Sequence, residues 1–227
     1  MGLAMYVMEN VLNHKELREI RGWLNKVKFI DGKATAKAVR EGVKNNIEAD
    51  IEDPMVAKIR EAVAVALSRH DVFLNYALPH KVRMPILSCY RPGMAYGNHL
   101  DMPLMGAGPI HSTRTDLSYT IFLSDPETYE GGELVIQTEL GEHKFKLPAG
   151  HGVIYPTTYI HRVAEVTKGE RRAVVNWLQS RVPDHDNRAV LYDVALALRD
   201  LPKDADGEQR MRLQHIYTRL FQKWVVI

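Results

Sequence analysis

The chain has 227 residues, 45% of them hydrophobic, so it can fill a sizeable core, and disorder over most of its length is excluded. Its 30 Lys and Arg residues nearly balance 28 Asp and Glu, so it lacks the basic excess of nucleic-acid-binding proteins, and no such partner is expected. No apolar run approaches the roughly 20 residues of a membrane span. Together with a single cysteine, Cys89, and no secretion signal, these features predict a soluble cytoplasmic protein with no membrane partner.

Two helices are predicted near the start of the chain. Asn13 and Glu16 have the spacing of a capping box, and apolar residues then recur at helical intervals. Asp53 directly before Pro54 is a typical helix start, and a second apolar face follows it. The segment 28–50 between these helices is polar, and we predict that it forms a loop.

From about residue 82 the apolar residues alternate with polar ones, as they do in strands. Turns rich in Gly and Pro separate a series of short runs. Runs this closely spaced, with no helices between them, are typical of an antiparallel sandwich or barrel and argue against a doubly wound parallel sheet. The predicted strands cover residues 82–89, 117–123, 133–138, 143–147, 152–155, 161–166 and 171–179.

After Pro183 the helical spacing returns in two apolar stripes, over 191–198 and 213–224. The aromatic residues of the second stripe are expected to pack against the barrel or against a second copy, which leaves a homodimer open as an assembly. We therefore predict a mainly β protein with flanking helices, in which the N-terminal helices pack on the sheet and a helical tail follows. The predicted units are 1–182 and 183–227.

His99 and Asp101 are the first candidates for a metal site. Side chains two residues apart on an extended chain point to the same face, so these two can offer an imidazole nitrogen and a carboxylate oxygen to one ion. His161, at the start of a later predicted strand, is the third candidate. Two histidines and one carboxylate form the ligand set of non-haem Fe(II) oxygenases, which leaves positions open for substrate and oxygen. The alternative is a surface turn, because a His-x-Asp tripeptide often occurs by chance.

Arg171 begins the last predicted strand, and its strand face also carries Ala173 and Trp177. If that face is interior, the guanidinium needs an anion, because an unpaired buried charge is costly. A dicarboxylate cosubstrate could supply it. The alternatives are an internal partner such as Glu165, or an arginine on the surface. Arg172 has the opposite parity and is expected to face water.

Several motifs along the chain fit one pattern. They are the segments Cys89–Gly93, His99–Asp101, Tyr129–Leu134, His161–Val163, Arg171 and Asn176–Arg181. This pattern resembles the prolyl 4-hydroxylase-type Fe(II)/2-oxoglutarate dioxygenases, and it is closer still to the bacterial PKHD-type hydroxylases, almost end to end. The resemblance implies a double-stranded β-helix (jelly-roll) core, Fe(II) held by His99, Asp101 and His161, 2-oxoglutarate held by Arg171, and L-ascorbate as a supporting reductant.

One departure concerns the far carboxylate of 2-oxoglutarate. The wider group usually offers a tyrosine and a threonine to help hold it, whereas Phe122 and Val175 occupy the nearest positions here. Arg171 is therefore expected to use other partners, and Tyr90 is a further candidate for cofactor binding.

The resemblance implies an enzyme that hydroxylates its substrate while converting 2-oxoglutarate to succinate and CO2. Two alternatives stay open. A cupin-like metal-dependent isomerase or hydrolase would not need Arg171, and a non-catalytic iron- or 2-oxoglutarate-sensing protein would release no succinate. The sequence does not identify the substrate, so either a small molecule or a peptidyl group is expected.

Overall fold

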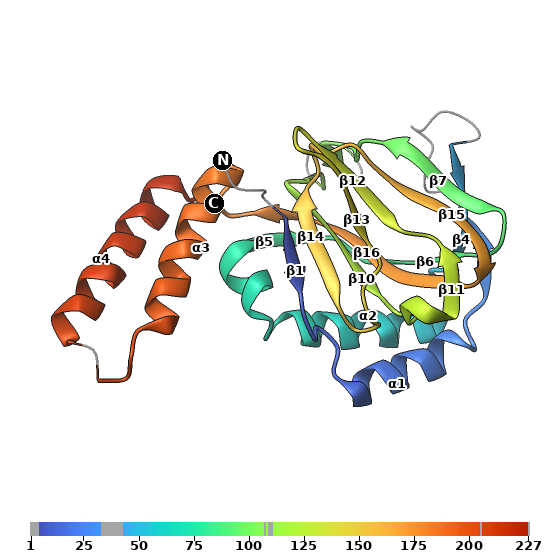
Figure 1. Ribbon diagram of the computed structural model, residues 1–227, viewed down its shortest axis with the longest axis horizontal. Helices are drawn as coiled ribbons and strands as arrows, with labels where there is room; N and C mark the ends of the chain where they lie inside the picture. Colours follow the sequence, from blue (N-terminus) through green and yellow to red (C-terminus); the bar gives the residue numbers. More distant parts are fainter. Residues whose placement is uncertain (1–4, 33–42, 107, 109–110, 205, 227) are drawn as a thin grey trace.

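The computed structural model describes residues 5–32, 43–106, 108, 111–204 and 206–226. As predicted, it is a mainly antiparallel β structure with a jelly-roll core and flanking helices (Figure 1). The strands of the larger sheet are β1 (Tyr6–Met8), β2 (Phe29–Asp31), β4 (Ile47–Ala49), β5 (Pro79–Val82), β6 (Ile86–Tyr90), β10 (Leu117–Phe122), β14 (Gly152–Pro156) and β16 (Arg171–Ser180). The strands of the smaller sheet are β3 (Lys44–Asn45), β7 (Met94–His99), β11 (Tyr129–Gly131), β12 (Leu134–Thr138), β13 (Gly141–Phe145) and β15 (His161–Gly169).

The strand order brings distant parts of the sequence together. The larger sheet runs β1-β14-β10-β16-β6-β4-β2, with β5 also paired to β16. The smaller sheet runs β13-β12-β15-β7-β3, with β11 also paired to β15. A separate ribbon pairs β8 (Leu104–Met105) with β9 (Thr113–Arg114). As a result, β7 and β15 are neighbours in one sheet, and β10 and β16 are neighbours in the other.

Two helices cover the outer face of the larger sheet (Figure 1). Helix α1 (His14–Leu24) begins at Asn13, and the predicted capping box with Glu16 is present. Helix α2 (Pro54–Leu67) begins at Asp53, whose side chain accepts from the Met55 amide. Apolar residues of both helices pack with outward-facing residues of β10, β14 and β16, which confirms the predicted contact between helices and sheet.

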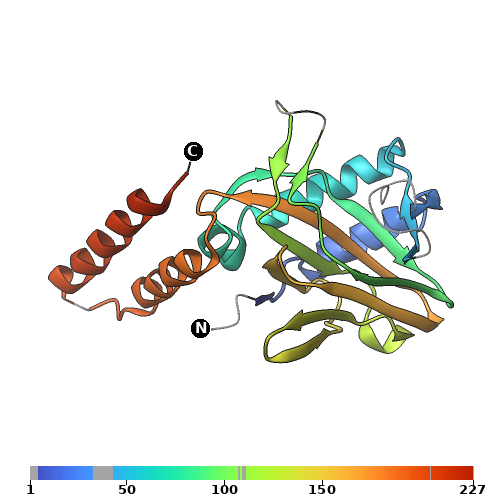
Figure 2. The same ribbon diagram turned by 90° about the horizontal axis from the view of Figure 1, so that it is seen from above.

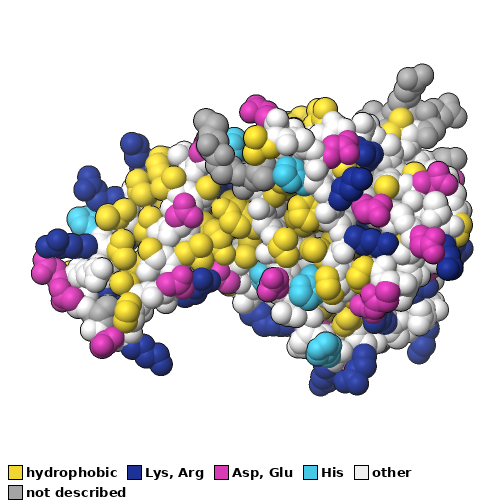
Figure 3. Space-filling view, in the orientation of Figure 1, with side chains coloured by type: hydrophobic (Ala, Val, Ile, Leu, Met, Phe, Trp, Pro, Cys, Tyr) yellow, Lys and Arg dark blue, Asp and Glu magenta, His cyan; other side chains and the backbone are white. Residues whose placement is uncertain are grey.

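A helical hairpin extends away from the sheets (Figures 1 and 2). It consists of α3 (His185–Asp200) and α4 (Gly207–Trp224). Leu191 of α3 is buried in a cluster with Leu78 and Val182, which lie just before β5 and just after β16. Half-buried aromatic residues of α4 pack against this cluster. In the space-filling view, hydrophobic side chains gather over the hairpin and where it meets the rest of the molecule (Figure 3). The proposed division after residue 182 stays a prediction.

The prediction of a loop over 28–50 was wrong. Among its described residues are β2, β3 and β4, each two or three residues long. β3 pairs with β7 and β4 pairs with β6, which lie in later parts of the chain, and β2 pairs with β4, so no local alternation of apolar residues indicates these strands. The predicted strand 82–89 is also interrupted, because β5 ends at Val82 and β6 begins at Ile86, with Pro85 between them. Within the described part of the chain, no helix is long and apolar enough to cross a membrane.

Candidate metal centre

The structure brings together the three predicted metal ligands. His99, the last residue of β7, lies directly opposite His161, the first residue of β15. Asp101 follows two residues after β7 ends, and its Oδ2 lies 3.6 Å from Nε2 of His161. One ligand atom from each of the three residues lies within 4.8 Å of the other two. The three side chains converge, so the alternative that His99 and Asp101 belong to a surface turn is wrong. Metal binding itself stays a prediction.

Backbone carbonyl groups orient both imidazoles. Nδ1 of His99 lies 2.8 Å from the carbonyl oxygen of Gly97, and Nδ1 of His161 lies 3.0 Å from that of Tyr159. A carbonyl oxygen can only accept, so each Nδ1 donates and each Nε2 keeps its lone pair for a metal. Burial, together with the neighbouring His161, lowers the pKa of His99 to about 4. His99 is therefore neutral near pH 7, which is the form that binds metal ions.

Two further side chains hold these ligands in place. Ser118, which points inward from β10, donates a hydrogen bond of 2.6 Å from its Oγ to Oδ2 of Asp101. The ring of Tyr96 stacks on His99 with 3.6 Å between ring centroids and 6° between planes. Sequence reasoning did not assign either role. The strand alternation placed Ser118 on a β-strand, but only the register of the folded sheets shows that it reaches Asp101.

Arg171 lies inside the jelly roll, so its strand face is interior and the surface alternative is wrong. It is the first residue of β16, directly opposite Tyr90 of β6, and only 1% of its surface is exposed. Its guanidinium carbon lies 5.3 Å from the ring centre of Tyr90 and 5.4 Å from that of Phe122. Among the described residues, Nε and Nη1 of Arg171 find no hydrogen-bond partner. Glu165 is exposed and does not serve as the counterion.

The neighbouring Arg172 provides the contrast. Its side chain binds the carboxylate of Glu170 and donates a hydrogen bond of 2.7 Å to Oδ1 of Asn25. It is partly exposed rather than fully so, which modifies the prediction that it simply faces water. Of two adjacent arginines, the outer one is therefore paired with protein groups, and the inner one is left for an anion that the described residues do not provide.

The donor set fits Fe(II) and a carboxylate-bearing cosubstrate. Two imidazoles and one carboxylate match the preference of non-haem iron, and ligands from one side leave coordination positions open. A buried guanidinium with unused donors suits a carboxylate, which it can bind through two parallel hydrogen bonds. We call the space between the inner faces of the two sheets, around the His99, Asp101 and His161 group and Arg171, the chamber. The residues of this chamber therefore fit both groups.

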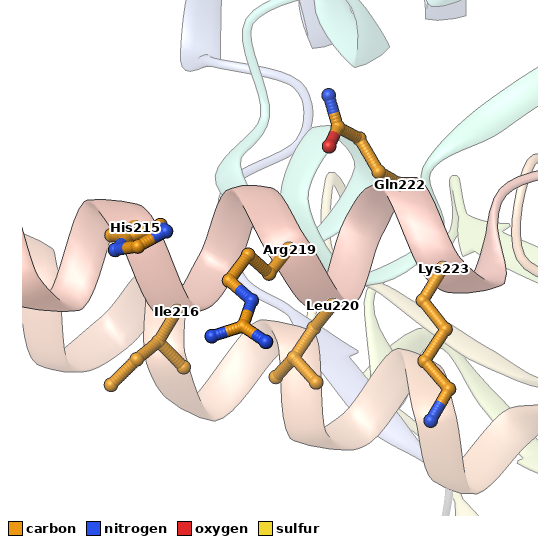
Figure 4. Close-up of a pocket in the computed structure, with 6 residues that line it drawn as sticks. All are labelled: His215, Ile216, Arg219, Leu220, Gln222 and Lys223. Carbon is orange, nitrogen blue, oxygen red and sulfur yellow. The ribbon is translucent and has the colours of Figure 1, made fainter.

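An open groove on the helical hairpin lies apart from this centre (Figure 4). It is lined by residues of α4, namely His215, Ile216, Arg219, Leu220, Gln222 and Lys223. None of these residues belongs to the His99, Asp101 and His161 group. The groove therefore contributes nothing to the metal centre.

Comparisons with known proteins agree with this chemistry. The family model of the 2OG-Fe(II) oxygenase superfamily matches residues 85–179. A PKHD-type hydroxylase of Hyphomonas neptunium is 46% identical over 190 residues, which cover 84% of each chain. One of Klebsiella pneumoniae is 39% identical over 224 residues, covering 98% of this chain and all of that protein. The structure of a Trichoplax adhaerens prolyl hydroxylase, at 16% identity, matches with a TM-score of 0.58 over 82% of this chain and 86% of that one, a likeness of fold.

Proposed function

Because this chain belongs to the PKHD-type hydroxylases, within the 2OG-Fe(II) oxygenase superfamily, we propose that it couples hydroxylation of its substrate to conversion of 2-oxoglutarate into succinate and CO2. Two observations together carry the proposal. Three metal-type ligands converge inside the jelly roll, and a buried arginine whose Nε and Nη1 have no hydrogen-bond partner among the described residues lies there too. A metal site alone would fit other reactions, whereas the unpaired arginine calls for an anionic cosubstrate.

Each residue has a defined task in this proposal. Iron, when bound, supplies the activation of oxygen. His99 and His161 offer Nε2 to it, and Asp101 offers a carboxylate oxygen while its Oδ2 is steadied by Ser118. Arg171 binds the far carboxylate of 2-oxoglutarate through its unused donors.

The lining of the chamber limits access by water. Tyr90 lies against the guanidinium of Arg171, and we propose that it contacts the bound cosubstrate. Phe122 and Tyr155 belong to a buried cluster that closes the inner faces of the two sheets. A dry chamber strengthens the interaction between the guanidinium and a carboxylate, because the local dielectric is low.

Arg171 separates the proposal from its alternatives. A cupin-like isomerase or hydrolase would not need this buried cation, and an iron or 2-oxoglutarate sensor would bind its ligand but release no succinate.

We also propose ascorbate as the reductant that restores iron after turnover without substrate. The substrate is a small molecule or a peptidyl group. A cytoplasmic location, the absence of a nucleic acid partner and a homodimer stay predictions from the sequence.

The test measures oxygen uptake and succinate formation with Fe(II), 2-oxoglutarate and ascorbate, and separately the binding of 2-oxoglutarate by calorimetry. Arg171→Gln should weaken 2-oxoglutarate binding at least about 100-fold, because two charge-assisted hydrogen bonds contribute about 1.5–3 kcal/mol each. Its metal affinity should be retained. Arg172→Gln, one residue away on the other face, is the matched control and should bind 2-oxoglutarate as wild type does. Equal affinity in both variants, or metal-dependent activity that consumes no oxygen, would contradict the proposal.

A further inference from the structure

Tyr129, like Arg171, is a buried residue with a polar side-chain atom that has no hydrogen-bond partner among the described residues. It is the first residue of β11, only 3% of its surface is exposed, and its hydroxyl group makes no hydrogen bond to the described residues. A phenylalanine would fill the same volume without burying an unsatisfied hydroxyl. The hydroxyl is therefore best explained by a ligand.

Tyr129 and Arg171 lie side by side. Both pack against Gly132, where a β-carbon would sit 3.1 Å from Cδ of Arg171 and 3.1 Å from Cε2 of Tyr129. Gly132 also has a φ of 68°, which disfavours any side chain there. The two side chains with unused donors thus reach the same corner of the chamber, from β16 and from β11.

Other groups around this corner are already engaged or apolar. The Tyr90 ring lies against the guanidinium of Arg171, and Phe122 offers only a ring. Lys146 lies on the other side of Tyr129, where Nζ donates a hydrogen bond of 2.8 Å to the Tyr129 carbonyl oxygen and sits 4.3 Å from the ring centre. This contact fixes the ring of Tyr129. Burial raises the pKa of the Tyr129 phenol, so the hydroxyl is a protonated donor at neutral pH.

We propose that the Tyr129 hydroxyl donates a hydrogen bond to the same far carboxylate that Arg171 binds, so that Tyr129 is a further binding residue for the cosubstrate. This inference rests on the proposed function. A guanidinium alone attracts any anion. A guanidinium and a hydroxyl group that both donate to the same place favour a ligand whose second carboxylate reaches that place when its other end is at the metal site. Tyr129 therefore contributes to the choice of 2-oxoglutarate over 2-oxo acids with one carboxylate.

The test compares Tyr129→Phe with Tyr119→Phe. The hydroxyl of Tyr119 is bonded to Asn176 on the outer face of the sheet, so this control loses a hydroxyl without touching the chamber. Calorimetry on Mn(II)-loaded protein, in which turnover is prevented, would measure binding of 2-oxoglutarate and of 2-oxobutyrate, which lacks the second carboxylate. We expect Tyr129→Phe to weaken 2-oxoglutarate binding about 10- to 100-fold and to leave 2-oxobutyrate binding unchanged. Without ligand, its midpoint of thermal unfolding should equal or exceed that of wild type.

The outcomes separate this inference from the proposed function. If wild type binds no 2-oxoglutarate, both fail. If wild type binds it and Arg171→Gln does not, but Tyr129→Phe binds as wild type does, the proposed function stands and the role of Tyr129 is wrong. A Tyr129→Phe protein that unfolds more easily and loses affinity for both 2-oxo acids equally would assign Tyr129 a structural role and also overturn the inference.

Discussion

Alternate residues of β10 face two different environments. Leu117, Tyr119 and Ile121 point outward and pack with α1 and α2, whereas Ser118 points inward and holds Asp101. Polar groups differ in the same way on the two sides. The outer Tyr119 hydroxyl accepts a hydrogen bond of 2.9 Å from Asn176, while the inner Tyr129 hydroxyl has no partner among the described residues. Oδ1 of Asn176 on the outer face also has no partner among the described residues. The outer face is otherwise apolar and packs against helices, whereas the inner face carries the unused donors of Arg171 and Tyr129.

The largest expected effect tests the outer face. Ile121 is fully buried, and Ile121→Ala should lower the free energy of unfolding by about 2–5 kcal/mol through lost apolar burial and the cavity that remains. Denaturant unfolding followed by circular dichroism measures this loss. The folded fraction should keep wild-type affinity for Mn(II), because Ile121 points away from the chamber. A matching fall in metal affinity would show that the two faces are not independent.

The inner face should respond in the opposite direction. Arg171→Met replaces an unpaired buried cation with an apolar side chain of similar length, so the ligand-free protein should gain on the order of 1–4 kcal/mol in the free energy of unfolding. Binding of 2-oxoglutarate should be lost in the same protein. Arg172→Met is the control, and it should gain nothing because it breaks the ion pair with Glu170. Destabilisation by Arg171→Met would mean that the arginine has an internal partner after all.

A smaller effect is expected behind the metal ligands. Ser118→Ala removes the hydrogen bond to Asp101 and should weaken metal binding about 10- to 100-fold, because such partners orient a ligand without touching the ion. Titration with Mn(II) measures the affinity. Ser124→Ala is the matched control, since Ser124 lies beyond the other end of β10 and its Oγ bonds the backbone at Glu170 and Arg172. Equal affinities in the two variants would remove Ser118 from the site.

The sequence predicted those parts of the molecule that depend on local spacing. The capping box at Asn13, the strand parity of Arg171 and the position of His161 at a strand start are all properties of short segments, and the structure agrees with each of them. The residues of β10 alternate between the outward and the inward face, as expected for a strand that is covered on both sides.

Contacts set by the register between strands could not be predicted in this way. Ser118 reaches Asp101, and the side chains of Tyr129 and Arg171 meet beside Gly132, only because the two sheets fold over each other. The short strands β3 and β4 were missed for the same reason, since segments of two or three residues carry too little pattern of their own. Tyr129 is part of the Tyr129–Leu134 motif, but a sequence motif does not show which of its side chains has a hydrogen-bond donor without a partner.

The smallest expected effect concerns the outer arginine network. Glu170 accepts hydrogen bonds from Arg91, at 3.0 Å, and from Arg172. Burial raises the pKa of Glu170, but these two hydrogen bonds outweigh it and hold the pKa below its ordinary value of 4.5.

A lowered pKa of Glu170 means that the stabilisation is present above pH 4.5 and is lost as the pH falls through the pKa of the folded state. Because the side chain of Glu170 is partly exposed and solvent screens its ion pairs, Glu170→Gln should cost no more than about 1 kcal/mol at pH 7. The unfolding free energies of wild type and variant should converge below pH 4.5. A difference that persists there would mean that Glu170 stabilises the outer face through its packing rather than through its charge.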